Sequence, residues 1–160
     1  MEKDNLISKL LKQRCDNSVG VLSPMILCQS VGVLNPHDPV TVREDTTLDE
    51  VIDILKKKKT GSVIVVNKQK ITGVFTERDV VLKVINEGFN LKETEVSEVM
   101  TKNPQTIAMT DSLAYALNLM SHGGFRHLPI TGDEGEAVGM LSVKDIVDFI
   151  ASKMTESLSL

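Results

Sequence analysis

Two short segments of the chain place a hydroxyl and a carboxylate at the same spacing. The chain reads GVFTERD near its middle, with Thr76 and Asp79, and GMLSVKD near its end, with Ser142 and Asp145. Where a strand turns into a helix, such a pair forms a capping box that bonds free backbone N–H groups of the first turn. The same groups can hold a polar ligand, because a helix N-terminus attracts anions and a carboxylate accepts from hydroxyls. For either copy alone, a purely structural cap is the stronger interpretation.

Features around the two segments favour a ligand. A glycine stands three residues before each hydroxyl, where the missing side chain lets another group approach the backbone closely. A cation, Arg78 or Lys144, precedes each carboxylate, although cations are unfavourable at the positive end of a helix. A bound anion would account for that placement.

A pair of basic residues occurs beside the second segment only. Arg126 and His127 begin a strand there and align with Gly61 and Ser62 of the first half. Arg126 is suited to bidentate contact with phosphate oxygens. The alternatives are a surface salt bridge from Arg126 to Asp133 or Glu134, and a packed strand histidine for His127. We therefore expect the two halves to differ in ligand binding.

The similarity between the two halves extends beyond these segments. Apolar helix positions match at a constant shift of 65 residues (113 − 48 = 65) before the central strand, and at 66 after it. One residue is thus inserted in a polar loop, where insertions are tolerated. The matched positions are Leu48, Val51, Ile52 and Leu55 with Leu113, Ala116, Leu117 and Met120, and Val80, Val81 and Val84 with Ile146, Val147 and Ile150.

Hydrophobic periodicity predicts the same order of elements in each half: strand, helix, strand, strand, helix. An amphipathic helix over residues 2–14 and an irregular arm precede them. The predicted strands are 40–43, 62–66, 70–76, 105–108, 127–131 and 137–142, and the predicted helices are 47–58, 77–87, 112–121 and 143–153. We expect an N-terminal helix and arm over 1–35, a first repeat over 36–92 and a second over 93–160. A repeat of roughly 60 residues is marginal alone, so the two should share one core.

This plan, the twin motifs and the string FRHLPI resemble a pair of cystathionine-β-synthase (CBS) domains, also called a Bateman module. The resemblance covers about Pro36 to Ser152. It implies an α+β fold of two β-α-β-β-α repeats, packed by pseudo-twofold symmetry with two crevices between them. It also implies binding of an adenosine compound: AMP, ADP, ATP, S-adenosylmethionine or NAD(H).

The resemblance assigns the two aspartates to the ribose hydroxyls. The hydroxyls of Thr76 and Ser142 are suited to phosphate or ribose oxygens, and the nearby basic residues to phosphate. Backbone groups of the strands would read the adenine edge. The full candidate set is Thr41, Ser62, Val63, Thr76, Arg78 and Asp79 in the first repeat, and Thr106, Arg126, His127, Leu128, Pro129, Ser142, Lys144 and Asp145 in the second.

Composition excludes several classes of function. The net charge is −4 and 3% of residues are aromatic, which argues against nucleic acid as the main partner. Neither a membrane segment nor a secretion signal is visible, so we expect a cytoplasmic protein. Cys15 and Cys28 lack zinc-site spacing and predict free thiols in a reducing compartment.

The sequence shows no nucleophile–base pair, metal cluster or P-loop, so we expect no enzyme and no metal. The principal hypothesis is a regulatory module that senses an adenine nucleotide and acts on a partner protein or on its own assembly. The alternative is a ligand-free scaffold or dimerisation module, and an enzyme subunit ranks third. We also expect a homodimer through helix faces, on the apolar stripes of helices 47–58 and 112–121 and on the family resemblance.

Overall fold

A computed structural model describes residues 24–85 and 87–158 of the chain. They form a mixed α+β fold in which helices and strands recur in each repeat, as the sequence predicts. The predicted helix over residues 2–14 lies outside the described residues. The chain divides into two compact units. The first comprises Met1–Pro36, Ile107–Leu128 and Met140–Leu160, and the second comprises His37–Thr106 and Pro129–Gly139.

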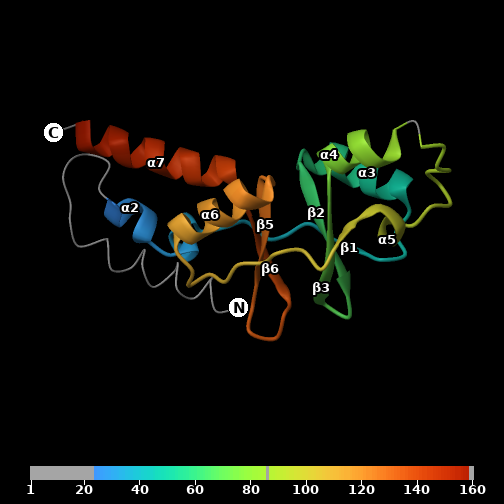
Figure 1. Cartoon of the computed structure of the whole chain (residues 1–160), viewed down its shortest axis with the longest axis horizontal. Coiled ribbons are helices and arrows are strands. Elements are labelled where there is room, and N and C mark those ends of the chain that lie inside the picture. Colours follow the sequence, from blue (N-terminus) through green and yellow to red (C-terminus); the bar gives the residue numbers. More distant parts are fainter. Residues whose placement is uncertain (1–23, 86, 159–160) are drawn as a thin grey trace. The chain divides into compact units, whose positions relative to one another are not determined.

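The second unit contains a four-stranded sheet of order β1-β2-β3-β4 (Figure 1). The strands are β1 (Thr41–Arg43), β2 (Ser62–Asn67), β3 (Lys70–Thr76) and β4 (Thr101–Lys102). β1 runs parallel to β2, whereas β3 is antiparallel to β2 and to β4. The start of β1, the start of β2 and the end of β3 therefore lie at the same end of the sheet.

Helix α3 (Leu48–Lys58) begins with a capping box, in which the side chains of Thr47 and Glu50 accept from each other's backbone N–H groups. Its apolar residues pack on one face of the sheet, to which every second side chain of each strand points. The buried core cluster of this unit includes Val42, Leu48, Val51, Leu55, Val63, Val65, Phe75, Val84, Val96, Val99 and Met100. Ser62 and Ile64 alternate with the core valines and so project from the other face.

The helix after β3 is shorter than predicted and changes type. It begins as α4 (Glu77–Asp79) and continues as η2 (Val80–Val84), a π-helix. The N–H of Ile85 donates to the C=O of Val80 at 2.9 Å, which is the i to i−5 bond of a π-turn. A further short helix, α5 (Val96–Val99), lies just before β4.

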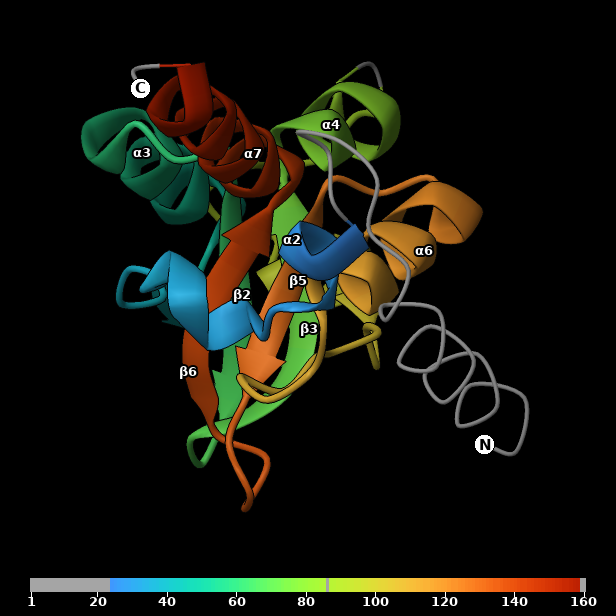
Figure 2. The same ribbon diagram turned by 90° about the vertical axis from the view of Figure 1, so that its left-hand side faces the viewer.

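The first unit contains most of the second repeat and the described part of the arm. Its helices are α2 (Pro24–Cys28), the 3-10 helix η1 (Val31–Leu34), α6 (Leu113–Gly123) and α7 (Val143–Leu158). Figure 2 shows α6 beside α2, and α6 is in contact with both α2 and α7. β5 (His127–Thr131) and β6 (Ala137–Ser142) form a two-stranded sheet, and the start of β5 and the end of β6 belong to this unit.

Two leading segments, residues 29–32 and 94–97, make equivalent contacts. Segment 94–97 follows the first repeat and pairs with the loop before α3, whereas segment 29–32 precedes the first repeat and pairs with the loop before α6. The equivalent backbone bonds, all at the 65-residue shift, are Val31 N–H to Asp111 C=O with Val96 N–H to Thr46 C=O, and Leu113 N–H to Gln29 C=O with Leu48 N–H to Thr94 C=O. Segment 29–32 therefore packs against the second repeat in the same way as segment 94–97 packs against the first.

Two further predictions about elements are wrong. Residues 105–108 form no continuous strand: only Ile107 makes a β-bridge there, and the N–H of Ala108 donates to the Asp111 carboxylate at 2.9 Å. The last helix reaches Leu158 rather than residue 153.

The expectation of free thiols is also wrong, since Cys28 is disulfide-bonded. The argument for a reducing compartment therefore loses its support, and Cys15 lies outside the described residues. Among the described helices, none has the length and apolar content needed to cross a membrane.

Candidate functional site

The first motif forms a complete capping box at the end of β3. One carboxylate oxygen of Asp79, Oδ2, accepts from the backbone N–H of Thr76 at 2.9 Å and from the Thr76 hydroxyl at 2.7 Å. The N–H of Asp79 in turn donates to Thr76 Oγ1 at 3.2 Å. The sequence predicts this geometry directly, because all partners lie within one turn.

The second motif repeats these contacts at the end of β6. Asp145 Oδ2 accepts from the N–H of Ser142 at 2.8 Å and from its hydroxyl at 2.7 Å. The N–H of Asp145 donates to Ser142 Oγ at 3.2 Å. Two separate stretches of chain thus hold a hydroxyl–carboxylate pair in the same way, with the second pair more exposed than the first.

The remaining carboxylate oxygen distinguishes the two copies. Lys83 Nζ lies 2.8 Å from Asp79 Oδ1, and the side chain of Asp79 is 13% exposed. For Asp145, the structure records no ion pair with any other described residue, and Oδ1 has no hydrogen-bond partner among them. Only the second carboxylate therefore presents a whole oxygen to a ligand. Lys83 is not among the candidates predicted from the sequence, although its i,i+4 spacing from Asp79 is a signal that could have indicated the ion pair.

Ser62 lies beside the first motif with an unsatisfied hydroxyl. It pairs in register with Thr76 across β2 and β3, and it is 3% exposed. Its Oγ has no hydrogen-bond partner among the described residues. A buried polar group without a partner costs free energy, so each such group calls for an explanation. A polar ligand atom reaching this end of the sheet would satisfy it.

The other candidates of the first repeat gather at the same end of the sheet. Thr41 begins β1 and is exposed, opposite Ile64 of β2. Val63 is fully buried with its side chain in the core, so only its backbone is suited to a ligand. Arg78 is exposed on the first turn after Thr76.

Backbone bonds support the predicted alignment of Arg126 with Gly61. The N–H of Glu77 donates to the C=O of Gly61 at 3.0 Å, and the N–H of Val143 donates to the C=O of Arg126 at 3.0 Å. Arg126 is exposed, and the part of the chain that the structure describes offers it no ion pair, including with Asp133 or Glu134. The salt-bridge alternative for Arg126 therefore finds no support.

The remaining candidates of the second repeat differ in accessibility. His127 is half-buried at the start of β5, and Leu128 and Pro129 after it are buried. Thr106 is half-buried in an irregular segment rather than in the predicted strand.

The cation before the second aspartate has a partner within its own helix. Lys144 Nζ bonds the Asp148 carboxylate one turn later. This hydrogen bond, with the negative charge of Asp148, raises the pKa of Lys144 above its ordinary value. A bound anion is therefore not needed to account for the position of this lysine.

The glycine before the first motif also has a packing role. A Cβ added to Gly73 would lie 2.2 Å from Sδ of Met100, which belongs to the buried core. The prediction that another group approaches this glycine closely is confirmed, but the group is a methionine side chain rather than a ligand.

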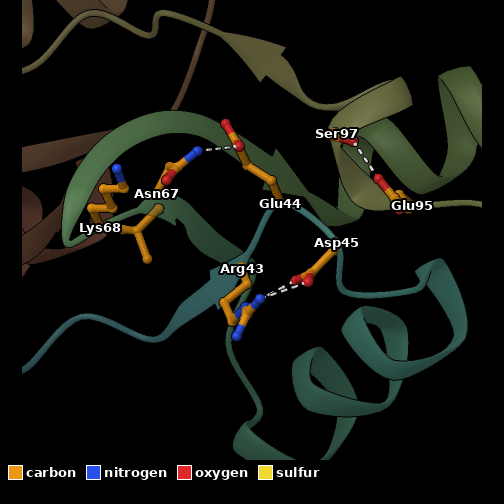
Figure 3. Close-up of a pocket in the computed structure, with 8 residues that line it drawn as sticks. Arg43, Glu44, Asp45, Asn67, Lys68, Glu95 and Ser97 are labelled. Atoms are coloured by element: carbon orange, nitrogen blue, oxygen red, sulfur yellow. Dashed lines mark hydrogen bonds and ion pairs between the residues drawn. The ribbon is translucent and has the colours of Figure 1, made fainter.

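A pocket of about 560 Å³ opens at the opposite end of β2 (Figure 3). Arg43 pairs with Asp45, Asn67 donates to Glu44 and Ser97 donates to Glu95 around its wall. The full lining is Arg43, Glu44, Asp45, Val66, Asn67, Lys68, Glu95 and Ser97. No motif in the sequence indicates this pocket, because its residues come from separate elements and loops: the ends of β1 and β2, the turns that follow them, and the start of α5.

This pocket is separate from the motif end of the sheet. Ser62 and Asn67 stand at the two ends of β2, about 16 Å apart at ~3.3 Å per strand residue. The candidate ligand residues of the first repeat therefore do not line it. Nor do the described residues contain a cluster of three or more His, Cys, Asp or Glu that could hold a metal ion.

Comparison with known sequences matches the family described as CBS domain to residues 32–86 and again to residues 96–152. The protein MK0525 of Methanopyrus kandleri is 33% identical over 119 residues, which cover 74% of this chain and 61% of that protein. The CBS domain-containing protein CBSCBSPB1 of Arabidopsis thaliana is 32% identical over 71% of this chain and 21% of its own length. The chain thus spans only part of these relatives.

Solved structures share the fold. The CBS-domain containing protein ATU1752 of Agrobacterium tumefaciens has a TM-score of 0.66 and 31% identity, with 74% of this chain and 94% of that chain covered. PAE2072 of Pyrobaculum aerophilum, in a complex with AMP, has a TM-score of 0.68 and 26% identity, with 77% and 98% covered. The CBS domain pair of MJ0100, in a complex with 5′-methylthioadenosine and S-adenosyl-L-methionine, has a TM-score of 0.71, with 79% and 98% covered. At 20% identity it shows the fold alone.

Proposed function

Because the chain belongs to the CBS-domain family and carries two copies of the domain, we propose that it is a regulatory module that binds an adenosine compound and is not an enzyme. The observation that carries this proposal is the pair of hydroxyl–carboxylate boxes with matching contacts. A ribose presents two adjacent hydroxyls, and a carboxylate oxygen accepts from such groups with charge-assisted hydrogen bonds. Asp79 and Asp145 are the proposed ribose ligands.

The groups around each box support a nucleotide rather than a sugar alone. In the first repeat the unsatisfied hydroxyl of Ser62 lies beside Thr76 and is suited to a polar ligand atom. In the second repeat, Arg126 is exposed and has no ion pair among the described residues. Its backbone C=O accepts from the N–H of Val143, the residue after Ser142. Arginine is suited to phosphate because its planar fork of donors matches phosphate oxygens.

Relatives support the class of ligand without deciding which member binds. PAE2072 was crystallised with AMP, and it is 26% identical to this chain. We propose AMP, ADP or ATP as the ligand of this chain, with S-adenosylmethionine and NAD(H) as further members of the same class. The regulated target would be another protein or the assembly of the chain itself.

Calorimetric titration with adenosine, AMP, ADP, ATP, S-adenosylmethionine and NADH tests the proposal. We expect saturable binding of at least one compound, with loss of affinity in Asp145→Ala. Mass spectrometry of small molecules that copurify would identify the natural ligand. A folded parent protein that binds none of the series would contradict the proposal, and hydrolysis of a bound nucleotide would contradict the non-enzymatic role.

A ligand-free scaffold is the second candidate, and one observation favours it. The contacts that the structure records for the two boxes are hydrogen bonds within each capping box and the ion pair of Asp79 with Lys83. Both motifs therefore already have a structural role. In that case the alanine variants would lose stability, since a helix cap contributes about 0.5–2 kcal/mol, but no ligand affinity would be at stake.

We further propose that the protein forms a homodimer. On α3 and α6 part of each apolar stripe is buried, whereas Ile52, Ile54 and Leu117 are half-buried and stay partly accessible. Most of the large apolar side chains that are exposed among the described residues lie on the last helix of each repeat: Val81, Leu82 and Ile85 on or next to η2, and Val147 and Met154 on α7. The others are Met25, Val33 and Phe89. Exposed apolar groups on related helices are typical of association surfaces. Light scattering that shows a monomer with and without nucleotide would exclude this assembly.

A further inference from the structure

The side chain of Lys83 pairs with Oδ1 of Asp79, the carboxylate oxygen that the capping box of the first motif leaves free. Its ammonium lies 2.8 Å from Asp79 Oδ1, and it also donates to the C=O of Val99 and to Thr101 Oγ1, both at 3.2 Å. These three contacts hold a lysine that is only 39% exposed. An exposed surface ion pair contributes little, but a partly buried ammonium with three acceptors keeps a defined position.

Counting lone pairs shows what the lysine takes away. A carboxylate offers about four acceptor positions, two on each oxygen. In both motifs Oδ2 accepts two bonds, one from the backbone and one from the hydroxyl of the box. Asp79 Oδ1 then accepts Lys83 and keeps about one position, whereas Asp145 Oδ1 keeps about two. A ribose diol donates two hydrogen bonds, so only Asp145 can accept both while every internal contact stays in place.

The second repeat has no ammonium at the corresponding position. The 66-residue shift places Phe149 where the first repeat has Lys83, four residues after the aspartate. Lys153, one turn further on, lies over the Phe149 ring at 5.7 Å and pairs with Glu156 rather than with Asp145. The difference between the two carboxylates thus follows from one residue type at one position.

We propose that Lys83 is a specificity-determining residue that competes with the ligand ribose for Asp79, so that the second repeat binds first. This inference rests on the proposed function. Full engagement of a ribose in the first repeat requires the lysine to leave Asp79 Oδ1. The ammonium then keeps its hydrogen bonds to the C=O of Val99 in α5 and to Thr101 Oγ1 in β4, but no longer has the carboxylate as a third partner.

The test isolates the first repeat by placing Asp145→Asn in every protein. Asparagine keeps an oxygen for the N–H of Ser142 and so preserves the cap better than alanine. The probe is adenosine, which has no phosphate, so that removal of a lysine charge does not act through phosphate attraction. In this background Lys83→Met should bind adenosine roughly 10- to 100-fold more tightly, the range of one charge-assisted hydrogen bond.

A second probe separates competition from a structural effect. 2′-Deoxyadenosine presents a single ring hydroxyl, which Asp79 can accept beside the lysine. Lys83→Met should therefore improve 2′-deoxyadenosine binding much less than adenosine binding, and the ratio of the two affinities should change. A merely structural role of Lys83 would move both affinities together.

Lys153→Met is the matched control, because Lys153 is 37% exposed against 39% for Lys83 and also forms an ion pair on the corresponding helix. It should leave both affinities unchanged. If Lys83→Met does not fold, Lys83→Gln replaces it, since the amide can still donate to Val99 and Thr101 without the charge. Circular dichroism checks the fold of each variant.

The outcomes separate the two proposals. In the Asp145→Asn background, a folded Lys83 variant that binds adenosine no more tightly than the protein with Lys83 overturns the competition. That result leaves the proposed function standing. A parent protein that binds no adenosine compound overturns the proposed function, and the role of Lys83 with it. Tighter adenosine binding with an altered ratio to 2′-deoxyadenosine supports both.

Discussion

The two repeats hold the same capping box but differ at the fourth residue after the aspartate. In the first repeat this residue is Lys83, which bonds Asp79. In the second it is Phe149, and the outer oxygen of Asp145 has no partner among the described residues. The comparison teaches that a duplicated motif does not imply duplicated binding. The box follows from local spacing, whereas the free acceptor positions depend on a residue one turn away.

A second difference lies in what surrounds each box. The first repeat buries an unsatisfied hydroxyl, Ser62, where the second repeat has His127. The second repeat exposes Arg126 where the first has Gly61. Beside its box the first repeat thus has a buried hydroxyl, whereas the second has an exposed guanidinium. The two should differ in affinity and in their dependence on phosphate.

The largest expected effect comes from removing one aspartate at a time. Asp145→Ala should reduce adenosine-compound affinity about 10- to 150-fold, because a hydrogen bond to a charged group contributes about 1.5–3 kcal/mol. Asp79→Ala should cost less, since Lys83 already shares that carboxylate. Calorimetry on both variants, with circular dichroism as the check of folding, measures the difference. Equal losses would break the proposed asymmetry.

Gly73→Ala separates the packing role of the first motif from its ligand role. The new methyl group would lie 2.2 Å from Met100 Sδ in the core, and overpacking of this kind typically costs about 1–3 kcal/mol. Urea unfolding should show that loss, while nucleotide affinity of the folded protein stays the same. The double variant Gly73→Ala with Met100→Ala should lose less stability than the sum of the losses of the two single variants, because the two residues are in contact. A fall in affinity without a fall in stability would restore the glycine to the ligand site.

Arg126→Ala should weaken AMP or ATP binding about 10-fold and adenosine binding little, because the guanidinium bonds phosphate oxygens and not the base. The side chain is exposed, so the difference should shrink at high salt. Titrations of AMP and adenosine at two ionic strengths measure it. An unchanged ratio of AMP to adenosine affinity would remove Arg126 from the site.

Ser62→Ala tests the unsatisfied hydroxyl of the first repeat. Without ligand the variant should be as stable as the parent or more stable by up to about 1 kcal/mol, because a buried group without a partner is removed. Thermal unfolding without and with saturating AMP should show a smaller ligand-induced rise in Tm for the variant. Ser97→Ala, whose exposed hydroxyl bonds Glu95, is the control and should match the parent. Clear destabilisation of ligand-free Ser62→Ala would mean that the hydroxyl has a structural partner.

Lys144→Met should have the smallest effect. Its ion pair with Asp148 is exposed, and such pairs contribute little. Because Asp148 raises the pKa of Lys144, any stability from the pair is present below the ordinary value of 10.5 and is lost as the pH rises through the higher folded value. Tm measurements at neutral pH should therefore hardly distinguish the variant from the parent. A large loss of AMP affinity would instead indicate that Lys144 leaves Asp148 to bind phosphate.

Local sequence was sufficient to predict the parts of the fold that depend on neighbours in the chain. The capping boxes of Thr47, Thr76 and Ser142 follow from partners within three residues, and strands β3, β5 and β6 have the predicted bounds. The duplication also predicted the alignment of Arg126 with Gly61, which equivalent backbone bonds support. Such features need no knowledge of what packs against them.

Other features were decided by contacts between distant residues. Gly73 accommodates Met100, which is 27 residues away in sequence (100 − 73 = 27). The leading segment 29–32 packs against a loop about 80 residues further along the chain (111 − 31 = 80).

The candidate site shows the same division. From sequence alone the two boxes are equivalent, because each hydroxyl–carboxylate pair has the same spacing at the start of a helix. The sequence also places Lys83 one turn after Asp79 and Phe149 one turn after Asp145, so it determined which carboxylate has a cation within reach. Tertiary structure decided what else holds the ammonium of Lys83, because the C=O of Val99 and Thr101 Oγ1 approach it from α5 and β4. Spacing along a chain specifies contacts within a turn and not those between separate elements.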